Sequence, residues 1–177
     1  MTRWFKRIAL ALVAALVVAQ FIPLKKTNPP VDPSKTMYAS LPVPPQVRNV
    51  FERSCKDCHS NETLWPWYSH VAPVSWVIVS DVHGGRAELN LSEWGTYNAK
   101  RKDRKFKEIC DQLTSGEMPD VKYTFIHRDA RLTDTERTAV CQWAEATRKT
   151  QATAPATPAA STDPAVKPAS AAPAKAP

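Results

Sequence analysis

Five residues at the end of the first third of the 177-residue chain, Cys55-Lys56-Asp57-Cys58-His59, constrain its fold more than any other stretch. The C-x-x-C-H pattern is the attachment signature of a c-type haem. One helical turn separates the two cysteines, so both thiols face one edge of the porphyrin, and the histidine supplies an axial nitrogen to the iron. The rest of such a chain has to cover the haem and to provide or withhold a sixth ligand.

Two other kinds of site also contain a C-x-x-C pair. A thioredoxin-like redox pair is expected after a strand in a βαβ context, and the sequence shows neither. A zinc site needs two further ligands close together, but Cys110 and Cys141 lie far apart without an adjacent histidine. Covalent haem is therefore the favoured interpretation.

The net charge of +7 is concentrated at the ends of the chain. Residues 1–45 contain six Lys/Arg and one Asp, whereas residues 46–150 contain 16 Lys/Arg and 15 Asp/Glu. The central region is thus almost neutral, which gives little support to a nucleic-acid-binding function.

Residues 1–24 have the pattern of an export signal or a membrane anchor. Basic residues precede an apolar run from Ile8 to Leu24. A cleavage site of the type Val17-x-Ala19 is present, but the apolar run continues beyond it, which favours a retained anchor. We expect a single-pass protein of a bacterial inner membrane with its soluble domain in the periplasm. The alternative is a cleaved signal and a soluble periplasmic protein.

Three further regions follow the anchor. Residues 25–45 are rich in proline and are expected to form an extended linker. Residues 46–149 form the candidate haem-binding domain. Residues 150–177 consist mostly of Ala, Pro, Thr, Ser and Lys, and we expect a disordered tail because this composition cannot bury a core.

Apolar periodicity predicts helices throughout the central domain. The first covers 46–54, and the second opens near Pro73 and stops at Gly84-Gly85. A third is expected to be capped by Ser92 and to start near Glu93. A fourth carries Phe106, Ile109, Cys110 and Leu113 on one face and ends at Gly116. The last opens at the capping box Thr133-Asp134-Thr135-Glu136.

Two groups of residues on these helices bear on compartment and partners. Cys110 and Cys141 lie on or beside two apolar faces, and an exported protein meets an oxidising compartment, so we expect a disulfide between them. The charged run Lys100 to Lys107 is interpreted first as a solvated helix face. The alternative is a docking patch for an acidic redox partner, whose identity the sequence does not give.

Met118 is the predicted sixth ligand of the haem iron. It lies in Gly116-Glu117-Met118-Pro119, just after a helix, where a cytochrome c places its distal methionine. His70, His83 and His127 are the competing candidates, and His127 lies closest to the required place in the chain. Trp65, Trp67 and Tyr68 are expected in a loop, either as a wall of the haem edge or as ordinary core residues.

The residues from Cys55 to Trp76, with Trp65-Pro66-Trp67-Tyr68-Ser69 after the haem motif, resemble the bacterial "haem-binding domain" family of small membrane-anchored c-type cytochromes. The likeness continues through Asp81 to Arg86, Leu89 to Trp94, Gly116 to Pro119 and His127 to Leu132, and it covers about residues 20 to 147. It implies an all-α, cytochrome c-like fold with one covalent haem c. It does not imply a particular redox partner or the disulfide.

The function expected from these observations is single-electron transfer, with Cys55 and Cys58 as thioether cysteines, His59 as proximal ligand and Met118 as distal ligand. We therefore expect an electron-transfer protein rather than a catalyst. One alternative is a haem enzyme of the peroxidase type, which needs a distal acid–base group such as His127 or Glu117. The other is a haem-free dithiol oxidoreductase that uses the two cysteines of the motif.

Overall fold

The computed structural model describes residues 2–22 and 24–153, and all regular secondary structure in these ranges is helical, as predicted. The α-helices are α1 (Thr2–Ala19), α2 (Met37–Ser40), α3 (Pro45–Ser54), α4 (Lys56–His59), α5 (Val74–Glu88), α6 (Ala99–Ser115), α7 (Val121–Ile126) and α8 (Asp134–Thr153). Short 3-10 helices, η1 to η4, cover Pro33–Lys35, Trp67–His70, Trp94–Thr96 and Arg128–Ala130.

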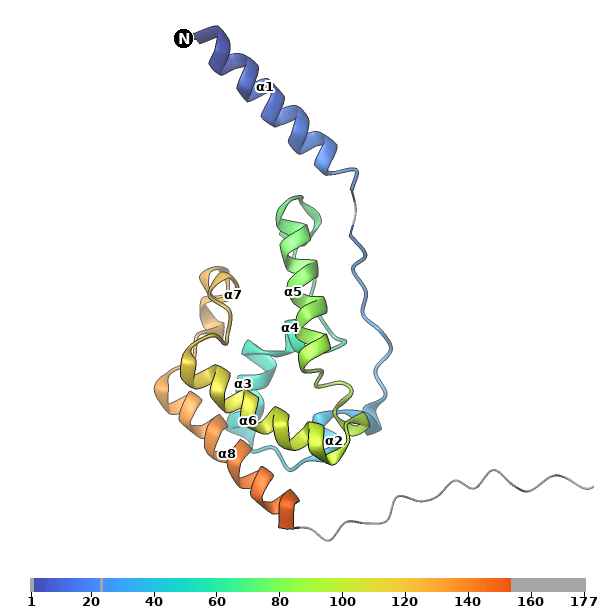
Figure 1. Ribbon diagram of the computed structural model, residues 1–177, viewed down its shortest axis with the longest axis vertical. Helices are drawn as coiled ribbons and strands as arrows, with labels where there is room; N and C mark the ends of the chain where they lie inside the picture. Colours follow the sequence, from blue (N-terminus) through green and yellow to red (C-terminus); the bar gives the residue numbers. More distant parts are fainter. Residues whose placement is uncertain (1, 23, 154–177) are drawn as a thin grey trace, which may run out of the picture.

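The core lies where α6 and α8 pack side by side and α3 packs against α8 (Figure 1). Buried aromatic rings join these elements. Phe106 lies 5.0 Å from Trp94 and 5.8 Å from Trp143, and Trp143 lies 5.6 Å from Phe51, all with edge-on geometry. Edge-on pairs of buried aromatic rings add stabilisation beyond the area that they bury. This cluster fixes the end of α3 that leads into the haem motif.

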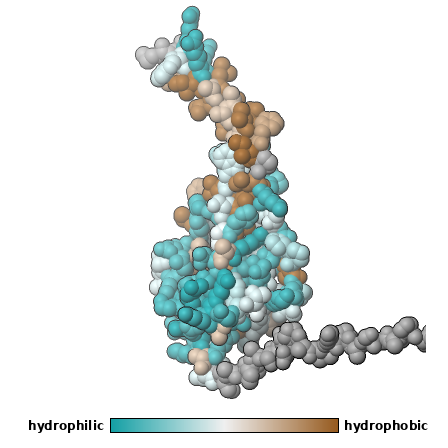
Figure 2. All heavy atoms as spheres, turned by 45° about the vertical axis from the view of Figure 1, so that its right-hand side comes forward, coloured by the Kyte–Doolittle hydropathy of each residue, from teal (hydrophilic) through white to brown (hydrophobic). Residues whose placement is uncertain are grey.

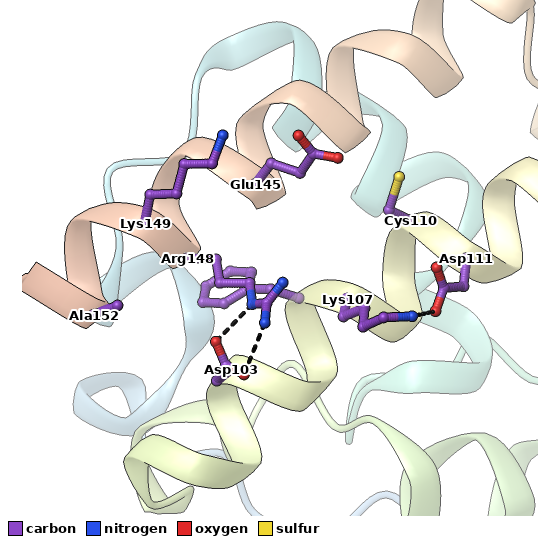
Figure 3. A pocket seen from close by; sticks show the side chains of 9 residues that line it. Asp103, Lys107, Cys110, Asp111, Glu145, Arg148, Lys149 and Ala152 are labelled. Atoms are coloured by element: carbon purple, nitrogen blue, oxygen red, sulfur yellow. Dashed lines mark hydrogen bonds and ion pairs between the residues drawn. The ribbon is translucent and has the colours of Figure 1, made fainter.

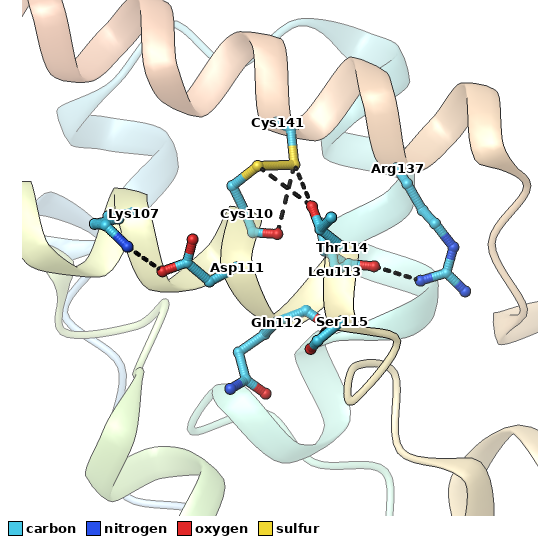
Figure 4. The surroundings of a disulfide bond; sticks show 9 residues. All are labelled: Lys107, Cys110, Asp111, Gln112, Leu113, Thr114, Ser115, Arg137 and Cys141. Atoms are coloured by element: carbon cyan, nitrogen blue, oxygen red, sulfur yellow. Dashed lines mark hydrogen bonds and ion pairs between the residues drawn. A yellow bond between two sulfur atoms is a disulfide. The ribbon is translucent and has the colours of Figure 1, made fainter.

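A disulfide between Cys110 and Cys141 joins α6 to α8 on the outer side of this core, with their Cα atoms 4.9 Å apart (Figure 4). Arg137 of α8 also donates a hydrogen bond to the carbonyl of Leu113 in α6, at 2.9 Å. The two longest helices of the domain are therefore joined by a covalent bond and a polar contact in addition to their apolar faces.

Part of the proline-rich stretch belongs to the folded domain, which corrects its prediction as an extended linker over 25–45. Met37 of α2 and Leu41 are buried in the main core cluster. The N–H of Met37 also donates to the carbonyl of Leu91 at 2.8 Å. Prolines set the backbone around these residues, but the two apolar side chains are held by packing, which proline content alone does not reveal.

Most helix boundaries follow their sequence signals. Gly116 ends α6 with a φ of 78°, a left-handed conformation that glycine adopts without strain. Thr133 and Glu136 form the predicted capping box at the start of α8, with reciprocal side-chain to backbone hydrogen bonds of 3.2 and 2.8 Å. α8 continues to Thr153, so residues 150–153 are helical rather than part of a disordered tail; the rest of that predicted tail lies outside the described residues.

Two predicted boundaries are wrong. α5 does not stop at Gly84-Gly85 but continues to Glu88. The helix expected from Glu93 is only the 3-10 turn η3, and α6 starts at Ala99 with Asn98 as its N-cap. Glycine lowers helix propensity, but it does not prevent a helix when tertiary contacts hold it.

Helix α1 exposes apolar side chains, which Figure 2 shows as a brown column rising from a mostly polar domain. Among the residues that the structure describes, no helix combines the length and the apolarity needed to cross a membrane. The membrane anchor expected from the sequence stays a prediction.

Candidate functional site

The C-x-x-C-H residues form a single turn directly after α3. Cys55 lies between α3 and α4, and its carbonyl accepts hydrogen bonds from the N–H groups of Cys58 at 3.2 Å and His59 at 2.9 Å. Both cysteines are free and half-buried. The turn therefore brings the two thiols and the imidazole together, as the spacing of the motif predicts.

The imidazole of His59 is oriented by two backbone carbonyls of α5. Its Nδ1 donates to the carbonyl of Gly85 at 2.9 Å and to that of Leu89, the residue after the helix, at 3.0 Å. This fixes the proton on Nδ1 and leaves Nε2 as the nitrogen that can bind a metal. Burial lowers the pKa of His59, and the two carbonyls oppose that shift only in part. The ring is thus held in the neutral, ligand-competent form at physiological pH.

Gly85 allows α5 to approach the motif closely. A Cβ atom at this position would lie 2.6 Å from the carbonyl oxygen of Cys58, closer than carbon and oxygen can approach. The adjacent Gly84 has open space around its Cβ position. The close contact at Gly85 places its carbonyl within reach of His59. The glycine therefore allows α5 to pack on the motif and does not end the helix.

Arg86, the next residue of α5, holds the loop after the motif. Its guanidinium donates to the carbonyl of Ser60 at 2.6 Å and to the hydroxyl of Thr63 at 2.7 Å. It also donates to the carbonyl of Thr27 at 2.6 Å and to the side chain of Asn28 at 2.9 Å. One side chain therefore ties the haem motif to the segment that follows α1.

The sequence did not predict α7, which side-chain contacts tie to the motif and to α5. Tyr123 of α7 donates its hydroxyl proton to Asp57 inside the C-x-x-C-H run at 2.8 Å. Lys122 pairs with Asp81 of α5 at 2.9 Å. Asp120 caps the helix by accepting from the N–H of Lys122 at 2.7 Å. That Asp at an N-cap position was the available signal, but six residues are too few for a periodic apolar pattern.

Met118 lies in the segment that links α6 to α7. Its N–H donates to the carbonyl of Gln112 at 3.1 Å, and its carbonyl accepts from Arg137 at 3.3 Å. Its side chain is partly exposed, at 36 % of its full accessible area. The contacts of the described residues do not join Met118 to His59, so its role as distal ligand stays a prediction.

The three competing histidines have different surroundings. Nε2 of His127 lies 2.5 Å from the hydroxyl of Tyr68, and the His127 ring stacks on Tyr123 with a centroid distance of 4.3 Å. Nδ1 of His70 lies 2.5 Å from Nζ of Lys26, and His83 is exposed on α5. His127 is thus the one of the three tied to α7, although one of its ring nitrogens already has a partner.

Three of the six cations in the Lys100 to Lys107 run, namely Arg104, Lys105 and Lys107, pair with carboxylates. Lys105 is buried and pairs with Glu88 at 3.1 Å and with Glu108, while Lys107 pairs with Asp111. Ion pairs within the same helix reduce the free positive charge that a docking partner would meet. These contacts favour the solvated helix face over the docking patch.

A cavity of about 570 Å³ lies apart from the motif, between α6 and α8 (Figure 3). The ion pair between Arg148 and Asp103, at 2.6 Å, lies along it. Its lining carries basic and acidic side chains in equal number, so it has no net charge to select an ionic ligand. The free thiols and the oriented imidazole are elsewhere, and they are the better candidate site.

A helical domain that presents two adjacent free thiols and a neutral, oriented histidine on one turn defines a candidate haem site. The family model described as "Haem-binding domain" matches residues 14–146, and the chain belongs to this family. No curated protein and no solved structure matches the sequence. The resemblance seen in the sequence is thereby confirmed, and the protein is a haem-binding protein.

Proposed function

We propose that this protein is a c-type cytochrome that carries one covalent haem and transfers single electrons. The observation that carries the proposal is the orientation of His59, whose Nδ1 is occupied by two carbonyls so that Nε2 is available to iron, next to two free thiols. A hydrogen-bonded Nδ1–H of this kind fixes the tautomer of a metal-binding histidine and increases its basicity.

The chain offers apolar surface for the haem on α7. Val121 and Phe125 of α7 are exposed. Lys122–Asp81 and Tyr123–Asp57 hold α7 near the motif. Large exposed apolar patches of this kind mark sites that a partner or a ligand covers.

In the proposed site, Cys55 and Cys58 would hold the haem, each thiol adding its S–H bond across one vinyl group with no atom lost. His59 provides the proximal nitrogen. The haem held by these residues would supply one-electron redox chemistry. Met118 is the proposed distal ligand, since the αL residue Gly116 allows its segment to leave α6. A thioether favours ferrous iron and raises the reduction potential above that of two histidine ligands.

A dithiol oxidoreductase is less well supported by the surroundings of the two thiols. Burial raises the pKa of Cys55 to about 12. Burial, with the nearby carboxylates of Asp57, Asp81 and Asp120, raises the pKa of Cys58 to about 11. A catalytic dithiol needs a thiolate, and therefore a lowered pKa.

A peroxidase would need a free distal acid–base group close to the iron. His127 has its Nε2 bound to Tyr68, and Glu117 is exposed on the loop after α6. A peroxide turnover assay on the haem-loaded protein separates electron transfer from peroxidase activity. An electron-transfer protein whose haem iron is six-coordinate should show little turnover.

We place the haem domain at the periplasmic face of a bacterial inner membrane, with α1 in the lipid. The basic residues Arg3, Lys6 and Arg7 precede the apolar run and would stay on the cytoplasmic side. The Cys110–Cys141 disulfide suits an oxidising compartment.

The proposal is tested by expressing the full chain with a c-haem maturation system and titrating it potentiometrically. We expect a single one-electron transition and a reduced-minus-oxidised spectrum of a c-type haem in the membrane fraction. Cys55→Ala and Cys58→Ala should lose covalent haem and most of the folded population. If either cysteine variant is fully folded and monomeric without haem, the proposal is contradicted.

A further inference from the structure

Apolar side chains gather at one end of the domain. Among the described residues, every large apolar side chain that is exposed lies in Trp4–Leu24, in 64–77 or in 118–126. Trp67 of η2 is 78 % exposed, and Val71, just after η2, is 45 % exposed. Residues 118–126 are tied to the haem motif through Tyr123 and are explained by the haem, whereas Val74 and Val77 lie in the first turn of α5, at the end that faces α1. Trp67 and Val71 lie outside α5 and α7 and need another partner.

The structure fixes the position of α1 relative to these two residues. The side-chain amide of Gln20 pairs with both backbone groups of Ala72, accepting from its N–H at 3.0 Å and donating to its carbonyl at 3.1 Å. Trp76 donates its indole N–H to the carbonyl of Ile22 at 3.1 Å. The chain therefore leaves α1 beside Val71, where the N-terminal end of α5 points toward α1 (Figure 1).

Further hydrogen bonds continue along the segment after α1. Lys26 donates to the carbonyl of Ser69 at 3.1 Å, and Asn28 donates to the carbonyl of Thr63 at 2.9 Å. Arg86 binds Thr27 and Asn28 from the domain side, as described above. The described residues 20–22 and 24–28, called the strap below, are held to the domain at all these points, so we expect the orientation of the domain to follow that of α1.

We infer that η2 and the residue after it form a lipid-contacting tip, in which Trp67 and Val71 rest on the bilayer surface that receives α1. This inference rests on the proposed membrane location and adds the orientation of the domain to it. Figure 2 shows apolar surface at the top of the domain, continuous with α1, above mostly polar sides. Tryptophan is enriched at the level of lipid headgroups, and the exposed Lys25 beside the tip suits anionic headgroups.

The tip should contact a bilayer rather than a protein, because it borders the helix that would enter the lipid. With α1 inserted and the strap bonded to Ala72 and Ser69, the tip is the part of the domain nearest the membrane. The haem motif lies at the other end of α5, where Gly85 contacts Cys58, so the haem would be held at a fixed distance from the lipid.

The test uses the haem-loaded full chain in vesicles of phosphatidylethanolamine and phosphatidylglycerol that contain a phospholipid with a photoreactive group near its glycerol. Mass spectrometry then maps the labelled peptides. We expect label on α1 and on 64–77, and none on α6 or α8. The double variant Trp67→Ser/Val71→Ser should lose label on 64–77 by about tenfold, with α1 labelling and the haem spectrum unchanged.

A second variant tests the strap without changing the tip. Gln20→Leu keeps a side chain of similar size at this position but removes the amide pair with Ala72, so labelling of 64–77 should fall while α1 stays labelled. If only α1 is labelled in the unmodified protein, the lipid-contacting tip is wrong but the proposed membrane location still holds. If α1 is not labelled, both the tip and the membrane location are wrong. A tip variant with a changed haem spectrum and unchanged lipid labelling would assign Trp67 to the haem, and would also overturn the inference.

Discussion

Gly84 and Gly85 are neighbours in α5 but have different surroundings, which gives a matched pair of substitutions. Gly85→Ala places a Cβ 2.6 Å from the carbonyl oxygen of Cys58, so α5 or the motif must move. We expect a loss of roughly 2–4 kcal/mol of unfolding free energy and incomplete haem incorporation. Gly84→Ala meets nothing within 4 Å and should stabilise the helix by about 0.5–1 kcal/mol.

Chemical denaturation of both variants, with haem content measured per polypeptide, checks this prediction. Equal stability and equal haem content in Gly84→Ala and Gly85→Ala would show that close packing of α5 on the motif does not matter.

Met118 is the residue whose role the fold leaves most open to a spectroscopic test. The oxidised protein should show a weak absorption band near the red edge of the visible spectrum, from a sulfur–iron bond, and Met118→Ala should lose it. His127→Ala and His70→Ala serve as controls and should keep the band. If Met118→Ala stays six-coordinate and low-spin while one histidine variant becomes high-spin, the ligation is bis-histidine, and the potential should be lower.

At the residue scale, the sequence predicts the chemistry well but not the supporting contacts. Cys55, Cys58 and His59 are recognised by spacing alone, because one turn of helix is a local property. The carbonyls that orient His59 belong to Gly85 and Leu89, some 26 and 30 residues further along the chain. The pair Gly84-Gly85 predicts a helix stop, but α5 continues to Glu88, because local propensity is a weak guide where tertiary contacts decide.

At the scale of elements, the Cys110–Cys141 disulfide joins α6 to α8 across 31 positions of sequence. Cross-linking a loop of this length should stabilise the domain by roughly 3–4 kcal/mol, mainly by restricting the unfolded chain. Cys110→Ser/Cys141→Ser should therefore unfold at lower denaturant concentration with its haem still bound. Thiol labelling of the unmodified protein, denatured but not reduced, should find no reactive thiol at Cys110 or Cys141. Two reactive thiols at these positions would show that the pair is not bridged.

The start of α8 gives a pH-dependent prediction. The pKa of Glu136 is lowered by the backbone N–H of Thr133 first and by Arg53 of α3 next. Because the folded pKa lies below the unfolded one, the carboxylate stabilises the fold above the unfolded pKa, and this contribution is lost as the pH falls through the folded pKa. Glu136→Gln should cost roughly 0.5–1 kcal/mol at neutral pH, since the group is partly solvated.

Urea titrations at neutral pH and in the acid range, at low and high salt, measure this difference. The difference in unfolding free energy between the unmodified protein and Glu136→Gln should disappear in acid and decrease at high salt. A gap that is the same at both pH values would point to packing instead of charge.

Long elements were easier to predict than short ones. α6 and α8 carry several turns of apolar periodicity and have recognisable ends, so their positions follow from the sequence. α7 has six residues, and α2 has four with Met37 buried at 0 % exposure. Such short helices are held by the core and by bonds such as Tyr123–Asp57, which only the three-dimensional arrangement reveals.

At the scale of the whole molecule, the sequence predicts an all-α haem domain, and the strap between α1 and the domain is what it misses. A proline-rich stretch is normally a spacer. Here Gln20, Lys26 and Asn28 bind the domain before that stretch enters the core at Met37. The hydrogen bonds of these polar residues go to backbone groups some 35 to 52 positions away, and no local pattern encodes such contacts.

The central claim, that Cys55 and Cys58 hold the haem covalently, is tested most directly by a pyridine haemochrome spectrum after denaturation and acid–acetone extraction. The full chain, expressed with a c-haem maturation system, should retain its haem on the polypeptide through extraction, with the spectrum of a haem that has lost both vinyl groups. Cys55→Ala/Cys58→Ala should retain none. Haem that moves entirely into the acetone from the unmodified protein would contradict the account.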